Sequence, residues 1–467
     1  MPATDGFGDV RNCPLSLLAA ATNRGVNRMH ALPVAMALPR SLADVDAGFM
    51  TLLLRARGVI SPSNSVVALD ERDVGMTAGY FSAIKRVICT FAEPTDAPSS
   101  YVVKTWPEFE ILPKEAIRAM FMKDIQAYQF PAEQFFPRAP ALLADFDAEN
   151  DRWALVMQDV EAFAEHKTHE NELNLDEVLR MIPGLVDMAV AWEGCHEGAK
   201  ATNLDGLGVG FWASEENLGI YRGVMPGGAK LFDKTTTMAD SSLIGRPTWD
   251  EALGQGIAEL FTNKIDAFYT PARPENGATC TLAHGDFRGD NIFFCTPTAA
   301  YPEGWLVIDF QLLFRGPVPS DLAYLMNSGS VLPSVYEGAG RETVLHAFYD
   351  RFMQRTTRYP DYTWDQFRDE FAMMSTVMFI YYVGMGAAFW QAGAFENARP
   401  LRVELGGRGA TEADLAPDEL RKRMWWTKTF RNFRANFAAF DQYSRLSSLP
   451  DNQGEMGPWA ELPAHLR

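Results

Sequence analysis

The residue types best suited to chemistry lie in one stretch, His284 to Asn291, which reads His-Gly-Asp-Phe-Arg-Gly-Asp-Asn. Asp309 follows Asn291 by eighteen residues, at the end of the apolar run 305–308. A carboxylate at Asp286 can accept a proton from an attacking hydroxyl group. The side chains of Asn291 and Asp309 supply the hard oxygen ligands that Mg²⁺ prefers. The spacing therefore predicts a phosphoryl-transfer site, with Asp286 as the base and the other two as metal ligands.

The same stretch has the Asp-x-x-x-x-Asn spacing of the protein-kinase catalytic loop, with Gly285 where those enzymes have Arg. A lone Asp in a loop is ordinarily a turn residue or a helix cap, and the shared spacing argues against that role for Asp286. Arg288 would either contact the transferred phosphate or pack within the loop. His284 is expected to hydrogen-bond the backbone and fix the loop rather than to take part in the reaction.

A second group of residues, earlier in the chain, has the character of a nucleotide-binding segment. Lys104 ends a short Val-Val-Lys run and is expected to contact the α- and β-phosphates, as the strand lysine of protein kinases does. Gly75 and Gly79 precede this strand and would let the backbone approach the phosphates. The acidic partner of Lys104 is Asp124 or, as a second choice, Glu115.

The elements that must position these residues change in character along the chain. Apolar and β-branched runs predict strands at 83–91, 101–105 and 153–157, and Gln158 and Val160 would then offer backbone groups to adenine. The short runs 292–295 and 305–308 predict a hairpin with the metal ligands at its ends. Helical patterns predict helices at 42–57, 114–130, 176–197, 249–267, 340–356, 364–390 and 417–443. Residues 201–248 are expected to be irregular, and the chain after Ser444 loosely ordered.

The composition of the 467-residue chain is that of a soluble globular enzyme, with 47% hydrophobic and 22% charged residues. The formal net charge of −18 argues against a general nucleic-acid partner, which needs basic surface, but allows a local basic pocket for ATP. Five scattered cysteines without a Cys-x-x-Cys spacing suit a reducing cytoplasm. Between Asp9 and Asp44 there are arginines but no acid, so organelle targeting stays an alternative to a loose extension.

The run from Phe371 to Trp390 contains no charged residue and is long enough to be considered as a membrane span. Its serine, threonine, tyrosine and glycine residues, and the charges just before it, instead favour a buried helix of a helical domain. No membrane partner is therefore expected.

These motifs resemble those of the aminoglycoside-phosphotransferase and choline-kinase-like superfamily, and within it the ecdysteroid-kinase-like branch. That branch has a similar glycine loop, Val-Val-Lys strand, His-Gly-Asp-x-x-x-x-Asn motif, and acid-x-x-x-Tyr helix, here Asp124 to Tyr128. Its Asp-aromatic-Gln motif and following Asp-Leu-Ala are matched at 309–311 and 321–323. The chain departs from the branch at Asp124, where Glu is usual, and at Phe287, where Leu or Tyr is usual.

The resemblance spans residues 40–445 and implies an α+β, protein-kinase-like bilobal fold, with a small antiparallel-sheet N-lobe and a larger, mainly helical C-lobe. It implies that Asp321 braces the catalytic loop. It also implies phosphorylation of a small hydroxylated molecule with ATP and Mg²⁺, and branches of the superfamily act on steroids, antibiotics, choline and sugars. The expected domains are an extension 1–41, a nucleotide-binding lobe 42–160, a catalytic and acceptor-binding lobe 161–445, and a tail 446–467.

Two other functions stay as alternatives. A protein kinase would need an activation segment, and the Asp-Leu-Ala at 321–323 begins only twelve positions after Asp309. A catalytically inactive nucleotide-binding module would not need the complete set of Lys104, Asp286, Asn291 and Asp309. Measured turnover of ATP, rather than binding, separates the inactive module from the enzyme.

Overall fold

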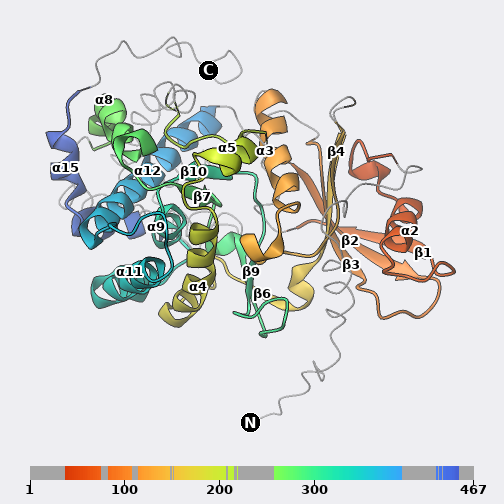
Figure 1. Ribbon diagram of the computed structural model, residues 1–467. Helices are drawn as coiled ribbons and strands as arrows, with labels where there is room; N and C mark the ends of the chain where they lie inside the picture. Colours follow the sequence, from red (N-terminus) through yellow and green to blue (C-terminus); the bar gives the residue numbers. More distant parts are fainter. Residues whose placement is uncertain are drawn as a thin grey trace, which may run out of the picture. The chain divides into compact units, whose positions relative to one another are not determined.

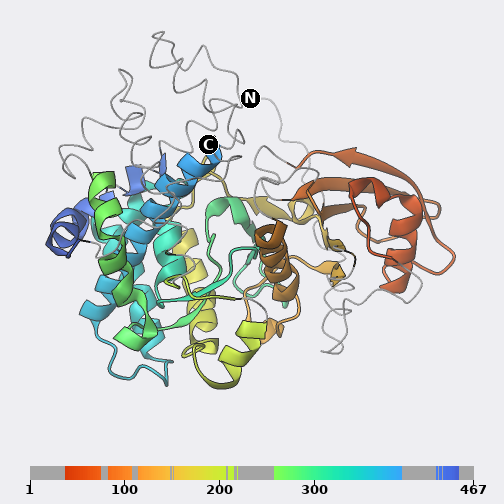
Figure 2. The same ribbon diagram turned by 90° about the horizontal axis from the view of Figure 1, so that it is seen from above.

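The computed structural model describes residues 37–74, 82–107, 114–147, 150, 152–206, 209–214, 218, 257–391, 428–429, 431–433 and 435–451. The chain divides into two compact units (Figures 1 and 2). Unit 1 comprises Met1–Pro131 and Arg138–Phe163, and unit 2 comprises Ala132–Pro137 and Ala164–Arg467. We propose the domain limits 1–41, 42–160, 161–445 and 446–467 that the sequence indicates.

Unit 1 is built on a five-stranded sheet in the order β1-β2-β3-β5-β4, with all neighbouring strands antiparallel. The strands are β1 (Val66–Arg72), β2 (Ala83–Phe91), β3 (Ser100–Thr105), β4 (Ala141–Asp147) and β5 (Arg152–Gln158). β3 is the middle strand, and its last five residues are buried. Lys104 therefore lies on the central, buried strand of the sheet. The predicted strands at 83–91, 101–105 and 153–157 are confirmed.

The outer strands β1 and β4 have no counterpart in the sequence prediction. Six of the seven residues of β1 are not buried, so its sequence lacks the apolar alternation that marks a half-buried strand. β4 is a short apolar run followed by acids, a pattern that does not by itself distinguish a strand from a helix segment. Pairing with β2 and β5, rather than local propensity, defines these two strands.

Two α-helices accompany the sheet of unit 1, α2 (Ala47–Ala56) and α3 (Lys114–Ala127). The Asp46 side chain caps α2 by accepting a hydrogen bond from the Phe49 N–H. The helix predicted from residue 42 therefore begins later, after a separate 3₁₀ turn, η2 (Leu42–Asp44). The buried face of α2 joins the core formed with the sheet, to which Leu53, Tyr101 and Val103 belong.

Unit 2 is mainly helical in its described part (Figure 1). Its helices are α4 (Leu175–Ala191), α5 (Gly198–Gly206), α8 (Ile257–Tyr269), α9 (Ser320–Asn327), α10 (Pro333–Tyr336), α11 (Gly338–Met353), α12 (Trp364–Gln391) and α15 (Gln442–Ser448). α4 packs on α11, and α9 packs on α12. With the antiparallel sheet of unit 1, this arrangement confirms the expected α+β class.

Two expectations for unit 2 are corrected. The segment from residue 201 was expected to be irregular, but its first residues belong to α5. The few apolar residues of α5 show little helical periodicity, so the sequence did not indicate a helix. The chain expected to be loose after Ser444 continues as α15, where Leu446 is buried. In the predicted helix 417–443, the described aromatics Phe433, Phe437 and Phe440 are buried, and their spacing of three or four residues is that of one helix face.

Unit 2 also contains short strands, and the segment from His284 to Asn291 lies between two of them. β6 (Ala164–His166), β8 (Ile292–Cys295) and β9 (Trp305–Val307) form a three-stranded sheet in the order β6-β8-β9. β7 (Thr281–Ala283) pairs with β10 (Phe314–Gly316). The antiparallel pairing of β8 with β9 confirms the predicted hairpin.

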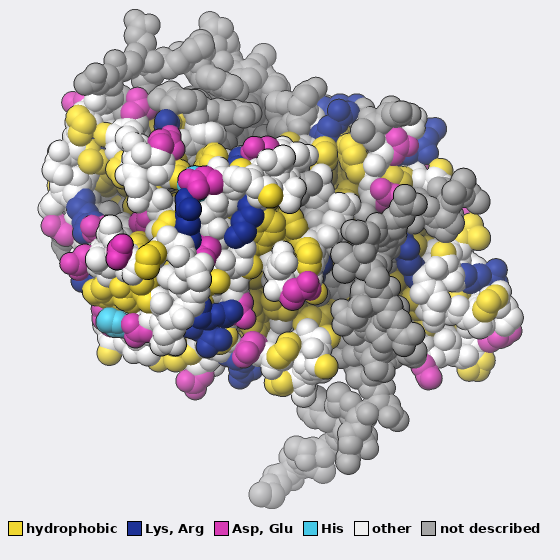
Figure 3. Space-filling view, in the orientation of Figure 1, with side chains coloured by type: hydrophobic (Ala, Val, Ile, Leu, Met, Phe, Trp, Pro, Cys, Tyr) yellow, Lys and Arg dark blue, Asp and Glu magenta, His cyan; other side chains and the backbone are white. Residues whose placement is uncertain are grey.

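α12 contains the uncharged run from Phe371 to Trp390, whose length alone made it a membrane candidate. Its described side chains include Phe371, Met374 and Val377, which are fully buried. Within the described part of the chain, no helix combines the length and apolar character that a membrane span requires. The face in Figure 3 shows basic and acidic side chains interspersed over the described surface.

Candidate active site

The stretch singled out in the sequence is a tight loop between β7 and β8 in unit 2, and it closes with the 3₁₀ turn η8 (Gly289–Asn291). Gly285 has φ of +84°, a left-handed conformation. A Cβ atom at this position would lie 2.1 Å from the Leu312 carbonyl oxygen. Both constraints exclude a side chain, so the loop needs glycine where protein kinases have Arg.

The Asp286 carboxylate is buried, with 6% of the residue exposed, and it is held from two sides. The Tyr324 hydroxyl donates a hydrogen bond to Oδ1. Asn291 Nδ2 donates to Oδ2 at 3.0 Å and to the Asp286 backbone oxygen at 2.8 Å. The carboxylate is thus fixed in orientation before any ligand binds.

Arg288 lies against the same carboxylate. Its Nε is 3.2 Å from Asp286 Oδ1 and 3.7 Å from Asp290 Oδ2. The structure thus places the guanidinium beside the candidate base.

Asn291 and Asp309 lie at adjacent ends of the β8–β9 hairpin. The Ile308 N–H donates to the Asn291 carbonyl at 3.0 Å, which brings the two ends together. Because both Asp286 atoms that face the Asn291 amide are acceptors, the amide must present Nδ2 to them. Its Oδ1 is then the atom left for a metal ion. Asp309 has φ of +71°, and its Oδ2 accepts a hydrogen bond from Gln311 Nε2 at 3.1 Å.

His284 fixes the loop through both ring nitrogens. Nδ1 accepts a hydrogen bond from the Asp286 N–H at 3.2 Å, and Nε2 lies 3.0 Å from the Ile308 carbonyl oxygen. The first contact requires an unprotonated Nδ1 and the second a proton on Nε2, so the ring is the neutral Nε2–H tautomer. His284 thus ties the catalytic loop to the hairpin end before Asp309, and the structural role expected for it is confirmed.

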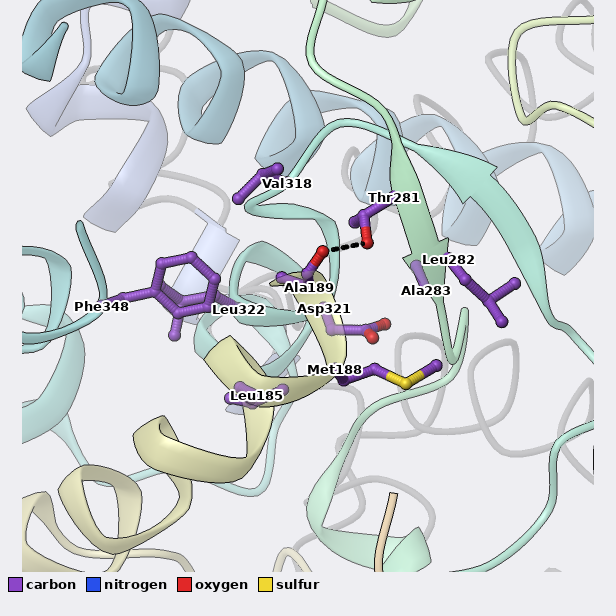
Figure 4. A pocket seen from close by; sticks show the side chains of 10 residues that line it. All are labelled: Leu185, Met188, Ala189, Thr281, Leu282, Ala283, Val318, Asp321, Leu322 and Phe348. Carbon is purple, nitrogen blue, oxygen red and sulfur yellow. Dashed lines mark hydrogen bonds between the residues drawn. The ribbon is translucent and has the colours of Figure 1, made fainter. Parts of the chain in front are cut away.

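Asp321, at the start of α9, braces the loop as the resemblance implied. Its two carboxylate oxygens accept hydrogen bonds from the His284 N–H at 2.8 Å and the Gly285 N–H at 3.1 Å. Figure 4 shows this carboxylate at a small cavity, among mainly apolar side chains. The other residues that line the cavity are Leu185, Met188, Ala189, Thr281, Leu282, Ala283, Val318, Leu322 and Phe348.

Burial raises the pKa of Asp321 from its ordinary value of 3.8 to about 7, although the two backbone N–H groups oppose the shift. The native state therefore holds a proton that the unfolded chain releases between these values. The protonation of Asp321 contributes fully to the free energy of unfolding below pH 4, and this contribution is lost as the pH rises through about 7. Between about pH 5 and about pH 8, the free energy of unfolding from urea titrations should fall more in the unaltered protein than in Asp321→Asn, by roughly 2–4 kcal/mol. Equal pH dependence would contradict this assignment.

Unit 1 contains the residues expected to bind the nucleotide. Lys104 Nζ lies 3.1 Å from Asp124 Oδ2, and both side chains are buried. Asp124, the first choice from the sequence, therefore contacts Lys104. The side chain of Glu115 and the glycines Gly75 and Gly79 lie outside the described residues.

Gln158 and Val160 lie where β5 leaves the sheet. The Gln158 N–H donates to the Pro140 carbonyl at 2.9 Å, whereas the Asp159 N–H turns to Ser100 on β3 at 3.1 Å. In an antiparallel ladder, the residue opposite Gln158 would return a hydrogen bond to the Gln158 carbonyl. Pro140 has no N–H and cannot do so. The Gln158 carbonyl is therefore left without this ladder donor.

Two residues of these sites were missed in the sequence. Tyr324 reaches Asp286 from 38 positions away. Its only sequence signal is its place directly after the Asp-Leu-Ala motif. Pro140 acts through β4, a strand that was not predicted.

One comparison with known proteins covers the segment that contains the catalytic loop. Residues 224–359 match the ecdysteroid kinase-like family, and this segment contains Asp286, Asn291, Asp309, Asp321 and Tyr324. No curated protein matches the chain. Over this segment, which carries the catalytic loop and the hairpin, the match agrees with the resemblance inferred from the motifs.

The solved structures to which the chain is similar are remote in sequence. A mutant of aminoglycoside 2'-phosphotransferase-IIIa in its GDP complex is 12% identical, with a TM-score of 0.41, over 78% of this chain and 100% of that one. Choline kinase from Cryptosporidium parvum Iowa II is 9% identical, with a TM-score of 0.42, over 86% and 96%. Plasmodium vivax ethanolamine kinase is 9% identical, with a TM-score of 0.41, over 85% and 89%.

Proposed function

We propose that the protein transfers the γ-phosphoryl group of ATP to a hydroxyl group of a small molecule. The observation that carries this proposal is the fixed Asp286 carboxylate beside Asn291, with Asp309 at the adjacent end of one hairpin. In this function Asp286 orients the acceptor hydroxyl and receives its proton. Arg288, held beside that carboxylate, supplies positive charge near the transferred group. Such reactions depend on positioning and charge neutralisation more than on covalent chemistry.

The donor set fits Mg²⁺. Asn291 Oδ1 and the Asp309 carboxylate are hard oxygen ligands, and bound Mg²⁺ would neutralise charge on the phosphate oxygens. Among the described residues, no group of three or more His, Cys, Asp or Glu gathers as a metal cage. Mg²⁺ in phosphoryl-transfer enzymes commonly uses only one or two protein ligands and completes its shell with phosphates and water. We therefore assign Asn291 and Asp309 to the metal.

The nucleotide assignment rests on unit 1. Lys104 would contact the α- and β-phosphates, with Asp124 holding its ammonium group in place. The Gln158 carbonyl, deprived of a ladder donor by Pro140, would accept a hydrogen bond from an adenine amino group. The Val160 N–H would donate to the base. Gly75 and Gly79 are retained as the proposed phosphate loop.

Lys104→Met should destabilise the protein by about 3–5 kcal/mol, because it leaves the Asp124 carboxylate buried without its cation. It should also weaken ATP binding. In Lys104→Met/Asp124→Asn the buried charge is removed, so the free energy of unfolding should largely recover while ATP affinity stays low. Urea unfolding and calorimetry with a non-hydrolysable ATP analogue measure the two effects. Recovery of ATP affinity in the double variant would show that Lys104 stabilises the fold and does not bind the nucleotide.

The chain between Asp309 and Asp321 bears on the protein-kinase alternative. It is described throughout and consists of a turn, β10 and the approach to α9. No activation segment lies within it. A small-molecule acceptor fits this arrangement better than a peptide platform.

A screen of ATP consumption with Mg²⁺ tests the function and identifies the acceptor. Ecdysteroids are the first candidates, because of the name of the matched family. Amino alcohols, sugars and aminoglycoside antibiotics complete the panel. We expect an acceptor-dependent release of ADP with one class and none with Asp286→Asn. ATP binding with no turnover under any condition would support the inactive nucleotide-binding module.

We also propose that the protein works in the cytoplasm. The four described cysteines, Cys89, Cys195, Cys280 and Cys295, are free thiols. Cys195 and Cys280 have Sγ atoms 3.7 Å apart and are not joined. Neighbouring free thiols suit a reducing compartment. Fractionation of cells that express the full chain, with compartment markers, tests the location.

A further inference from the structure

We infer that Tyr324 is a positioning residue that orients the Asp286 carboxylate so that Oδ2 receives the acceptor proton. This inference rests on the proposed function and deepens it. The Tyr324 hydroxyl donates a hydrogen bond to Oδ1, and the side chain is buried, with 3% of the residue exposed. Tyr324 comes from α9, outside the loop that contains the base.

α9 is suited to hold the loop because it contacts the loop twice from one face. Asp321 and Tyr324 are three residues apart and therefore neighbours on the helix surface. The first accepts hydrogen bonds from the His284 and Gly285 N–H groups, and the second donates to Asp286. All eight residues of α9 are buried, and the helix packs on α12. The buried helix α9 therefore fixes the position from which the Tyr324 hydroxyl reaches Asp286.

The hydrogen bonds to Asp286 distinguish its two oxygens. Oδ1 accepts from Tyr324 and lies 3.2 Å from Arg288 Nε. Oδ2 accepts from Asn291 Nδ2. A carboxylate oxygen has two lone pairs, so Oδ2 keeps one for an incoming hydroxyl proton, whereas Oδ1 is engaged by the Tyr324 hydroxyl and by the charge of the Arg288 guanidinium. The χ2 torsion of an aspartate is only weakly restricted by itself. The Tyr324 hydroxyl restrains it through Oδ1, and Asn291 restrains it through Oδ2.

Tyr324→Phe removes this hydrogen bond and keeps the ring. The matched control is Tyr362→Phe, since the Tyr362 hydroxyl donates to Glu370 Oε2, another buried carboxylate of unit 2. The assay is hydrolysis of Mg-ATP with water as the acceptor hydroxyl, measured together with affinity for a non-hydrolysable ATP analogue. Tyr324→Met, which fills similar space without a donor, is the second variant if the first fails to fold.

We expect Tyr324→Phe to lower kcat for ATP hydrolysis about tenfold, as a loosened catalytic group does, with analogue affinity unchanged within about twofold. Tyr362→Phe should leave kcat within about twofold. In an Asp286→Asn background, Tyr324→Phe should have no further effect, because the tyrosine acts through Asp286.

Three results would overturn the inference: an unchanged kcat in Tyr324→Phe, an equal loss in Tyr362→Phe, or a full tenfold loss added to that of Asp286→Asn. Each leaves the proposed function standing if Asp286→Asn itself is inactive. Full activity of Asp286→Asn, or no Mg-ATP turnover by the unaltered protein with water or with any acceptor of the panel, would instead remove the proposed function and this inference with it.

Discussion

Asp286→Asn should reduce phosphoryl transfer by about 10²-fold or more, while affinity for nucleotide stays within a few-fold of that of the unaltered protein. The substitution keeps the size of the side chain and removes both its charge and its ability to accept a proton. Two donors, the Tyr324 hydroxyl and Asn291 Nδ2, point at this side chain. An amide can accept at one oxygen only, so the variant also loses the orientation of the group.

Turnover with the identified acceptor and calorimetry with an ATP analogue measure the two effects of Asp286→Asn. Glu370→Gln is the matched control, because Glu370 is also a buried carboxylate that accepts a hydrogen bond from a tyrosine hydroxyl, Tyr362. It should lower stability without a comparable loss of kcat. Unchanged turnover in Asp286→Asn would make Asp286 a structural residue of the loop.

Asp309→Asn should lower turnover by about 10²-fold or more at ordinary Mg²⁺ concentration, because it removes a charged metal ligand. Asn is preferred to Ala because position 309 has φ of +71°, a conformation that Asn and Asp tolerate better than other side chains. The side chain is partly exposed, so the fold should be little affected.

A Mg²⁺ titration of both turnover and ATP-analogue affinity tests the role of Asp309. The matched control is Asp441→Asn, an aspartate with φ of +47° at the start of α15, away from the catalytic loop. It should leave the Mg²⁺ dependence unchanged. Near-normal turnover in Asp309→Asn would refute the metal assignment.

The sequence was most informative where the chemistry lies in contiguous residues. The spacing of His284 to Asn291, and the two apolar runs around Asp309, predicted the loop and the hairpin because short-range pattern determines both. The buried contact between Lys104 and Asp124 was also anticipated, since the helix follows the strand closely in sequence.

What the sequence did not reveal depends on contacts between distant segments. The hydrogen bond from Tyr324 to Asp286 exists only once α9 has packed behind the loop. The effect of Pro140 on the Gln158 carbonyl required the pairing of β4 with β5, and no local pattern predicted β4. The raised pKa of Asp321 likewise follows from its burial among side chains of α4, β7 and α11 rather than from its neighbours in sequence.

The central claim is best tested by following the label from ATP labelled at the γ-phosphate, with Mg²⁺, into the panel of hydroxylated small molecules. The predicted result is a labelled phosphoester on one class of acceptor, formed by the unaltered protein and lost in both Asp286→Asn and Asp309→Asn. A protein that binds ATP but labels no small molecule and releases no phosphate, or one whose labelling survives both substitutions, would contradict the claim.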